Sequence, residues 1–297
     1  MRFCFLVYAV CLLMSFEAQA AVSEKDLQGK YAYGDYEVRT YREQESGEGQ
    51  LKIFKHSEEV FSETGVSYRV GLMYDDIPEN SLVKIGNDIT GDGQPDLVIS
   101  HWSGGAHCCF TFYVFNIGEK FQLVDVIDNG DGDLGKFVDI DNDGVLEFQG
   151  NDWSYGYWHE CFAASPAPEI ILKYQDGKYR LALALMKKPL PSPEQEETLI
   201  NEIRKDQSEV LKQIKEDMKT VGQTDADNFA WVKNDFVLTS KVWGHMLELI
   251  YTGHPNEAWL FLDKIYPKRS PEKDAFIKDF KKKMSESKYW DSIVQIL

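Results

Sequence analysis

The sequence has few cysteines, no long apolar run after residue 20, and fewer basic than acidic residues. Only 5 of the 297 residues are cysteine, and two of them, Cys4 and Cys11, lie in the first twenty. No segment after residue 20 is apolar enough to cross a bilayer, so we expect no membrane span there. The net charge of -17 at pH 7 would repel phosphate backbones, which argues against nucleic acid as a partner.

The sequence also lacks the motifs of common enzyme classes. It contains no G-x-S-x-G, H-E-x-x-H, P-loop or dinucleotide-binding pattern. Asp, His and Ser occur throughout the chain, but in no arrangement typical of a catalytic site. We therefore assign no catalytic residue and favour a non-catalytic protein.

The first twenty residues have the layout of a secretory signal peptide. Arg2 precedes an apolar run from Phe3 to Phe16, and the segment ends in Ala18-Gln19-Ala20. Such a segment is removed on export, here before Ala21, and its apolar run is too short for a membrane anchor. We therefore expect a protein of the periplasm or the extracellular space.

In the rest of the chain, the sequence pattern changes near Pro189 from one typical of strands to one typical of helices. Residues 21–189 contain short segments rich in aromatic and β-branched residues, separated by turn signals such as NIGEK at 116 and QDGK at 175. Residues 190–297 show helical spacing of apolar residues, beginning with a capping box at Ser192-Pro193-Glu194-Gln195. We predict an α+β protein, in which an antiparallel β domain at 21–189 precedes an all-α helical domain at 190–297.

The β half contains an internal repeat. KIGNDITGDGQPDLVIS (84–100) aligns with KFVDIDNDGVLEFQG (136–150), with matching positions 51 residues apart. A Cys-bearing aromatic segment and a hairpin follow each loop. The repeat units are about 84–134 and 135–185, and residues 31–75 are a candidate for a third, degenerate unit.

Each repeated loop has oxygen-bearing residues at the spacing that calcium requires. Calcium takes about six to eight oxygens, and short loops supply them from alternate residues, with glycine at the tight turn. In the first loop, the candidate ligands are Asp88, Thr90, Asp92, the carbonyl of Gln94, and Asp96. In the second loop, they are Asp139, Asp141, Asp143, the carbonyl of Val145, and Glu147. The alternative is an Asp-rich turn without an ion, because Asp, Asn and Gly favour turns by themselves.

The two loops are similar to the calcium loops of FG-GAP/VCBS repeats, which form the blades of integrin-α-type β-propellers. The family pattern is D-x-[DN]-x-D-G-x-x-D, and here Thr90 and Glu147 depart from it. The resemblance implies a structural Ca2+ in each loop and propeller-like antiparallel units. Two or three units are too few for a closed ring, so we expect a partial propeller or a sandwich.

Three cysteines remain after residue 20, and export would place them where disulfides persist. One interpretation pairs Cys161 with Cys108 or Cys109 and so joins the two repeats. A second is a vicinal bond between Cys108 and Cys109. A third is chemical, with a thiolate activated by His107 or a Cys/His metal site.

The segment DWSYGYWHECF (152–162) is rich in aromatic residues. Such residues on a strand are usually core, but an exposed set could bind a sugar ring or a peptide. The candidate ligand surface comprises His107, Trp153, Tyr155, Trp158 and His159.

Two functions remain in competition. The favoured one is an exported calcium-binding protein whose β domain binds an unidentified protein or glycan. The alternative is an envelope hydrolase, acting on glycans or phosphoesters with a loop-bound cation. A structural ion would be closed in by protein oxygens, whereas a catalytic ion keeps an open position facing a cleft.

Overall fold

The computed structural model describes residues 23–73, 83–106, 108–132, 135–220 and 238–297. The predicted signal peptide lies outside the described residues. The α+β fold class is confirmed, because antiparallel sheets occupy the N-terminal part and most helices lie in the C-terminal part.

The described strands form three four-stranded antiparallel sheets, each made of strands consecutive in sequence. The first sheet contains β1 (Leu27–Tyr33), β2 (Tyr36–Arg42), β3 (Gly49–Lys55) and β4 (Glu58–Gly65). The second contains β5 (Ser67–Val70), β6 (Asp96–Trp102), β7 (Phe110–Ile117) and β8 (Phe121–Gly130). The third contains β9 (Lys136–Val138), β10 (Glu147–Asn151), β11 (Glu169–Gln175) and β12 (Lys178–Leu181).

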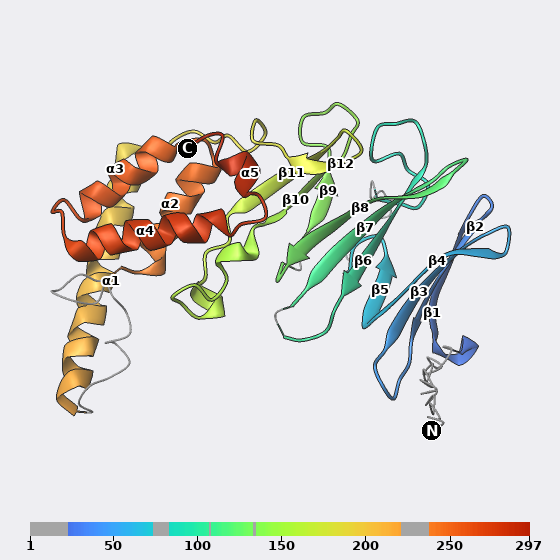
Figure 1. The fold of residues 1–297 in the computed structure, drawn as a ribbon, viewed down its shortest axis with the longest axis horizontal. Coiled ribbons are helices and arrows are strands. Elements are labelled where there is room, and N and C mark those ends of the chain that lie inside the picture. Colours follow the sequence, from blue (N-terminus) through green and yellow to red (C-terminus); the bar gives the residue numbers. More distant parts are fainter. Residues whose placement is uncertain (1–22, 74–82, 107, 133–134, 221–237) are drawn as a thin grey trace, which may run out of the picture.

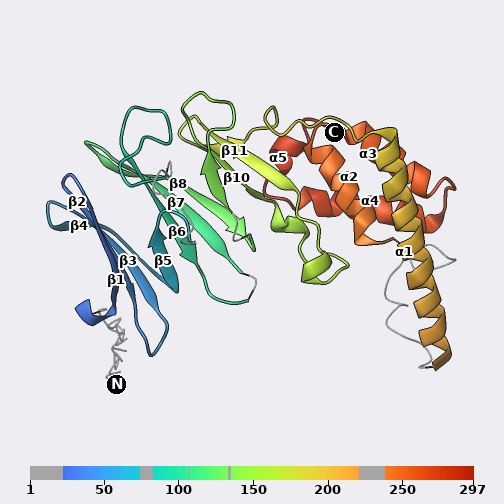
Figure 2. The same cartoon turned by 180° about the vertical axis from the view of Figure 1, so that it is seen from behind.

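The sheets stack face to face in a row, as Figure 1 and the reverse view in Figure 2 show. The second sheet is the middle layer, and its strands β6 and β7 carry buried residues on both faces. Leu97 and Ile99 of β6 pack against the first sheet, whereas Val98 between them packs toward the third. The near-continuous apolar run of β6 follows from this position, because each face of a strand covered on both sides needs apolar residues. The stack has one layer more than a two-sheet sandwich. Of the two arrangements expected from the sequence, it is closer to the partial propeller.

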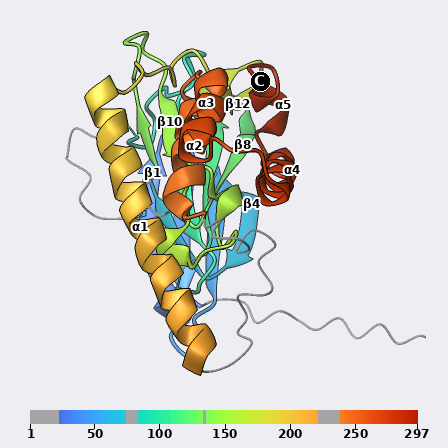
Figure 3. The same cartoon turned by 90° about the vertical axis from the view of Figure 1, so that its left-hand side faces the viewer.

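The helices lie beyond the third sheet. They are α1 (Pro193–Thr220), α2 (Ser240–Tyr251), α3 (Pro255–Ile265), α4 (Pro271–Ser285) and α5 (Trp290–Ile293). Short 3-10 helices are η1 (Glu24–Asp26), η2 (Trp153–Tyr155) and η3 (Phe162–Ala164). Figure 3 shows α1 running past the other helices. The helices do not have a core of their own, because one buried cluster continues from Phe148 and Ile170 of the third sheet to Trp243 and Phe261.

Local signals in the sequence explain several element boundaries. Ser192 accepts a hydrogen bond from the Gln195 backbone, and the Gln195 side chain accepts one from the Ser192 backbone, so the predicted capping box is formed. QDGK forms the tight turn between β11 and β12, in which Gln175 pairs with Lys178. Asp176 and Gly177 both have positive φ, as a type I′ turn requires.

Candidate metal site in two neighbouring loops

The two predicted calcium loops lie side by side at one edge of the stack. The loop at 88–95 leads into β6 and the loop at 139–146 leads into β10, and both are at the top of Figure 1. The Ile89 carbonyl accepts a hydrogen bond of 2.8 Å from the Leu146 N–H. Gly91 packs so closely on the second loop that an added Cβ would lie 2.5 Å from Val145 Cγ2. The loops are therefore in direct contact, which their separation in sequence does not reveal.

The turn of the first loop is held by its own acidic side chains. Asp88 accepts hydrogen bonds from the backbone N–H groups of Gly91, at 2.7 Å, and Gly93, at 2.8 Å. Asp92 accepts one of 2.8 Å from the N–H of Gln94. Gly93 has a φ of +81°, the left-handed conformation expected for the glycine of such a loop.

Asp96 ends the first loop and is only 1% exposed. Its Oδ2 accepts three hydrogen bonds: from the Ile89 N–H at 3.0 Å, the Thr90 N–H at 3.1 Å, and the Thr90 hydroxyl at 3.0 Å. Its Oδ1 is buried without a hydrogen-bond donor. Burial raises the pKa of Asp96 to about 6, although the Ile89 and Thr90 hydrogen bonds act in the opposite direction. The first loop therefore contains a buried carboxylate oxygen that has no partner.

The second loop repeats this pattern of hydrogen bonds. Asp139 accepts from the N–H groups of Asp143, at 3.0 Å, and Gly144, at 3.1 Å. Asp143 accepts from the N–H of Val145 at 2.9 Å. Glu147, which is fully buried, accepts from the N–H of Ile140 at 2.8 Å. The two loops are thus built alike, and Glu147 takes the place of Asp96.

The loops differ in how closely their carboxylates approach one another. Oxygens of Asp139, Asp141 and Glu147 lie within 4.8 Å of one another, and no such grouping occurs among Asp88, Asp92 and Asp96, all of which the structure describes. Like charges repel, so a group of three carboxylates needs a positive charge nearby. That charge comes from a residue outside the loop.

Lys173 of β11 supplies the positive charge at the second loop. Its Nζ lies 2.6 Å from Asp141 Oδ2, 2.5 Å from Asp143 Oδ2 and 3.1 Å from Glu147 Oε1. The contact with Glu147 is an ion pair without an aligned hydrogen bond. Burial alone would lower the pKa of Lys173, but the hydrogen bonds to Asp141 and Asp143 and the negative charge of Glu147 outweigh it and raise the pKa above its ordinary value. The hydrogen bond from Lys173 in turn lowers the pKa of Asp143.

The first loop has an amide in the corresponding place. Asn116 of β7 donates a hydrogen bond of 3.1 Å from Nδ2 to Asp92 Oδ2. Neither Asn116 nor Lys173 was predicted, because neither is part of the loop pattern. Asn116 is the first residue of NIGEK, near the end of β7, and Lys173 lies in β11 before QDGK. Only the pairing of these strands with β6 and β10 brings the two residues to the loops.

The cysteines do not join the two repeats. Cys108 is bonded to its neighbour Cys109, and Cys161 is free and exposed. Of the interpretations left open by the sequence, the vicinal bond is therefore the one formed, and Cys161 precedes η3 on the surface. Asp131 lies within 4.8 Å of the two paired sulfurs. His107, the expected base, lies outside the described residues.

Two aromatic residues of the candidate ligand surface, Tyr155 and Trp158, pack against the helices. Tyr155 is fully buried, and its hydroxyl is 3.0 Å from that of Tyr251 on α2. Trp158 packs on Trp243 and Phe280 of the helices, with ring centroids 5.5 and 6.0 Å away. These two aromatic residues belong to the core, the interpretation favoured from the sequence, because the helices cover them.

The other two described residues of the candidate ligand surface, His159 and Trp153, lie near the surface of the protein. His159 Nε2 is 2.9 Å from Asp279 Oδ2 on α4. Trp153 stacks on Phe162, with ring centroids 5.0 Å apart, and Tyr157 beside them is 59% exposed. Tyr157 and Phe162, which were not among the predicted residues, thus form the outer part of the aromatic surface.

The loops and the Cys/His segments lie at opposite ends of the same strands. The first loop precedes β6, and residues 103–106 and 108–109 follow this strand. The second loop precedes β10, and residues 152–162 follow that strand. Seven residues of β6 span about 20 Å. Figure 1 shows the loops at the upper edge and the other segments at the lower edge. His159 is therefore remote from both loops.

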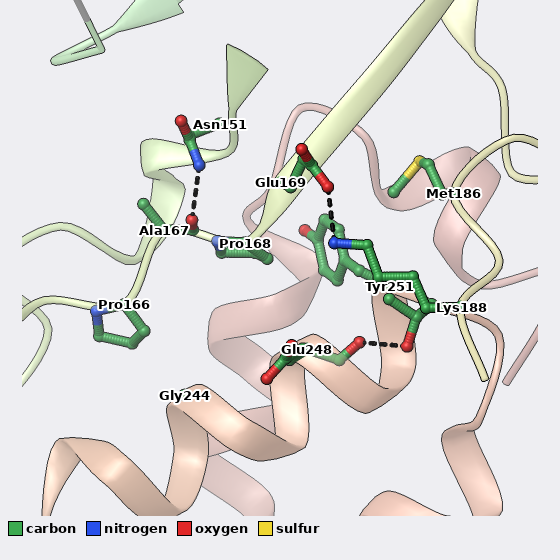
Figure 4. A pocket seen from close by; sticks show the side chains of 11 residues that line it. Asn151, Pro166, Ala167, Pro168, Glu169, Met186, Lys188, Gly244, Glu248 and Tyr251 are labelled. Atoms are coloured by element: carbon green, nitrogen blue, oxygen red, sulfur yellow. Dashed lines mark hydrogen bonds and ion pairs between the residues drawn. The ribbon is translucent and has the colours of Figure 1, made fainter. Parts of the chain in front are cut away.

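A pocket of about 440 Å³ lies between the third sheet and α2, and Figure 4 shows its lining. Lys188 reaches across it to Glu169, with Nζ 2.7 Å from Oε2. Glu248 is 3.5 Å from His245 Nδ1. The pocket is near Asn151, at the end of β10 away from the loops. Its charged groups are paired with one another, and nothing in the sequence pattern pointed to it.

No helix in the described part of the chain is long and apolar enough to cross a membrane. In comparisons with known proteins, the chain matches no family model, no curated protein and no solved structure. The resemblance to FG-GAP/VCBS repeats therefore stays a prediction based on the two loops.

Proposed function

We propose that the protein is an exported, non-catalytic calcium-binding protein whose stacked sheets form a binding module. The observation that carries this proposal is the buried Oδ1 of Asp96, which has no hydrogen-bond donor. A buried carboxylate oxygen without a partner costs free energy, and a bound cation would offset that cost.

The residues around Asp96 fit calcium. Oxygen ligands suit a hard cation, and the first loop offers Asp88, Thr90, Asp92, the carbonyl of Gln94, and Asp96. Calcium supplies positive charge that draws these oxygens together and ties β6 to the loop before it. The second loop offers the same kinds of ligand, but Lys173 already lies among them.

Two features that a hydrolase site could use, the imidazole of His159 and the pocket beside Asn151, lie away from the loops. The hydrolase alternative requires a cation that faces a cleft together with an acid or base. Among the described residues, His159 and the pocket beside Asn151 lie at the other end of the strands. Neither can act on a group bound at the first loop.

Export rests on the signal-like residues 1–20, and the vicinal cysteine pair is compatible with an oxidising compartment. We propose the periplasm or the extracellular space as the location. The partner is a protein or a glycan, for which the exposed Tyr157 and its neighbour Phe162 offer an aromatic contact. The strongly acidic charge disfavours nucleic acid.

The test is titration of the purified protein with CaCl2 by calorimetry, beside thermal melts in calcium and in chelator. We expect calcium to bind and to raise the melting temperature, since a ligand at 100 times its Kd adds about 2.7 kcal/mol. Asp92→Ala should abolish binding at the first loop. Absence of both heat and a melting shift in the wild-type protein would refute the proposal.

A further inference from the structure

The acids of the second loop already contact a positively charged group, the Lys173 ammonium, which belongs to the chain itself. The Lys173 ammonium lies between 2.5 and 3.1 Å from oxygens of Asp141, Asp143 and Glu147. These are three of the residues that the loop pattern assigns to calcium. The Lys173 side chain is 16% exposed and reaches down to the fully buried Glu147, whereas Asp141 and Asp143 lie on the solvent side of the contact.

The pairing of the strands makes Lys173 the counterpart of Asn116. In the second sheet, Asp96 pairs with Asn116. In the third sheet, Phe148 pairs with Leu172, and the same register places Glu147 opposite Lys173. Each residue contacts the equivalent loop acid, Asn116 reaching Asp92 and Lys173 reaching Asp143. At this equivalent position, the first site has a neutral amide and the second an ammonium.

An ammonium and a calcium ion cannot share these oxygens. Calcium binds oxygen at about 2.3–2.6 Å, which is close to the distance from Lys173 Nζ to Asp141 and Asp143. An ion at the same oxygens would overlap the ammonium and be repelled by its charge. Calcium could enter only after Lys173 had left and exposed its charge elsewhere. Asn116 imposes no such cost at the first loop, because its side chain carries no charge.

We propose that Lys173 is an internal cation that closes the second loop to divalent metals, so that each chain binds calcium at the first loop alone. The inference rests on the proposed function for the calcium chemistry of the loop fold. As a consequence, the stability of the first loop depends on the calcium concentration, whereas the second loop keeps its structure without calcium.

The experiment exchanges the two equivalent residues and counts the ions bound. CaCl2 is titrated into the full-length purified protein by calorimetry, up to ten times the concentration that half-fills the first loop. The wild-type protein should bind one ion per chain. Lys173→Asn should bind two, and Asn116→Lys should bind none.

Three further variants locate the effect. Lys173→Met keeps the length of the side chain without its charge and should also gain a site, whereas Lys173→Arg keeps the charge and should gain none. Lys178→Asn removes a positive charge from an exposed position in the same hairpin and should stay at one ion. In the Lys173→Asn protein, Asp143→Ala should return the count to one.

Two results would overturn the inference. One is a folded Lys173→Asn or Lys173→Met protein that binds no more ions than the wild type. The other requires no lysine variant: a wild-type protein with two sites, one of which Asp143→Ala removes. A wild-type protein without a site, in which Lys173→Asn creates one, would refute the proposed function at the first loop while supporting the role of Lys173.

Discussion

The first and second loops have the same backbone pattern and differ in the side chain that meets their acids. The first loop faces the neutral Asn116 and leaves Asp96 Oδ1 without a donor. The second loop faces Lys173, whose charge holds Asp141, Asp143 and Glu147 together. A loop motif alone therefore does not determine whether a metal binds, because a strand outside the motif can provide a positively charged side chain instead.

The largest expected effect is at Lys173 in the absence of calcium. Lys173→Ala in chelator should destabilise the protein by about 2–3 kcal/mol, because the fully buried Glu147 loses its cationic partner. Denaturant unfolding monitored by circular dichroism measures this. Calcium should then restore part of the lost stability, which it would not do if the second loop had no affinity for cations.

A smaller effect is expected where the loops touch. Gly91 has a φ of +74°, and an added Cβ would lie 2.5 Å from Val145 Cγ2. Gly91→Ala should therefore cost about 1–2 kcal/mol from backbone strain and crowding. Gly93→Ala is the matched control, because Gly93 has a φ of +81° but no atom within 4 Å of the added Cβ. Equal losses in the two variants would show that contact between the loops contributes nothing.

In chelator, the free energy of unfolding should change between pH 7 and pH 5 by about 1 kcal/mol through the first loop, and not through Asp143 of the second. Burial raises the pKa of Asp96 to about 6, above its unfolded value near 3.8. The folded protein therefore binds an extra proton between these two values, and this group makes the protein more stable as pH falls from 7 to 5, by about 1 kcal/mol.

Asp96→Asn removes this titration and is the control. The difference in unfolding free energy between pH 7 and pH 5 should be smaller in the variant by that amount. Asp143 should show no gain in this interval, because the hydrogen bond from Lys173 lowers its pKa below the ordinary value of 3.8. Identical pH profiles for wild type and Asp96→Asn would contradict the account of the first loop.

The smallest effect is expected at Asn116. Asn116→Ala in chelator removes the exposed hydrogen bond to Asp92 and the one that Asn116 Oδ1 accepts from the Gly118 N–H, and should cost about 0.5–1 kcal/mol. Chemical denaturation beside Lys173→Ala gives a direct comparison of the two equivalent positions. Similar losses at both would mean that the ammonium has no special role.

Much of the local structure followed from short-range signals. The cap at Ser192, the turn at QDGK and the two Asp-rich loops depend on residues within a few positions of one another. Backbone hydrogen bonds and left-handed glycines are satisfied inside such segments, so their sequence is sufficient to predict them. The same signals indicated the change from strands to helices near Pro189.

Long-range pairings could not be predicted in this way. The sequence left open whether Cys161 bridges to the first repeat or Cys108 bonds to Cys109, and the structure has the vicinal bond. It also left open whether Trp158 is core or part of a ligand surface, and Trp158 is packed against Trp243 and Phe280 of the helices. In both cases the outcome depends on which distant element covers the segment, and periodicity does not contain that information.

The sequence by itself determined that two loops of alternating oxygen-bearing residues precede two strands, because turn chemistry is local. Only the tertiary structure decided that these loops touch and that one meets an amide and the other an ammonium. Strand register is responsible for this difference. Pairing β6 with β7 and β10 with β11 brings residues 20 to 30 positions away into each loop, and their charge then determines the cation that the loop can hold.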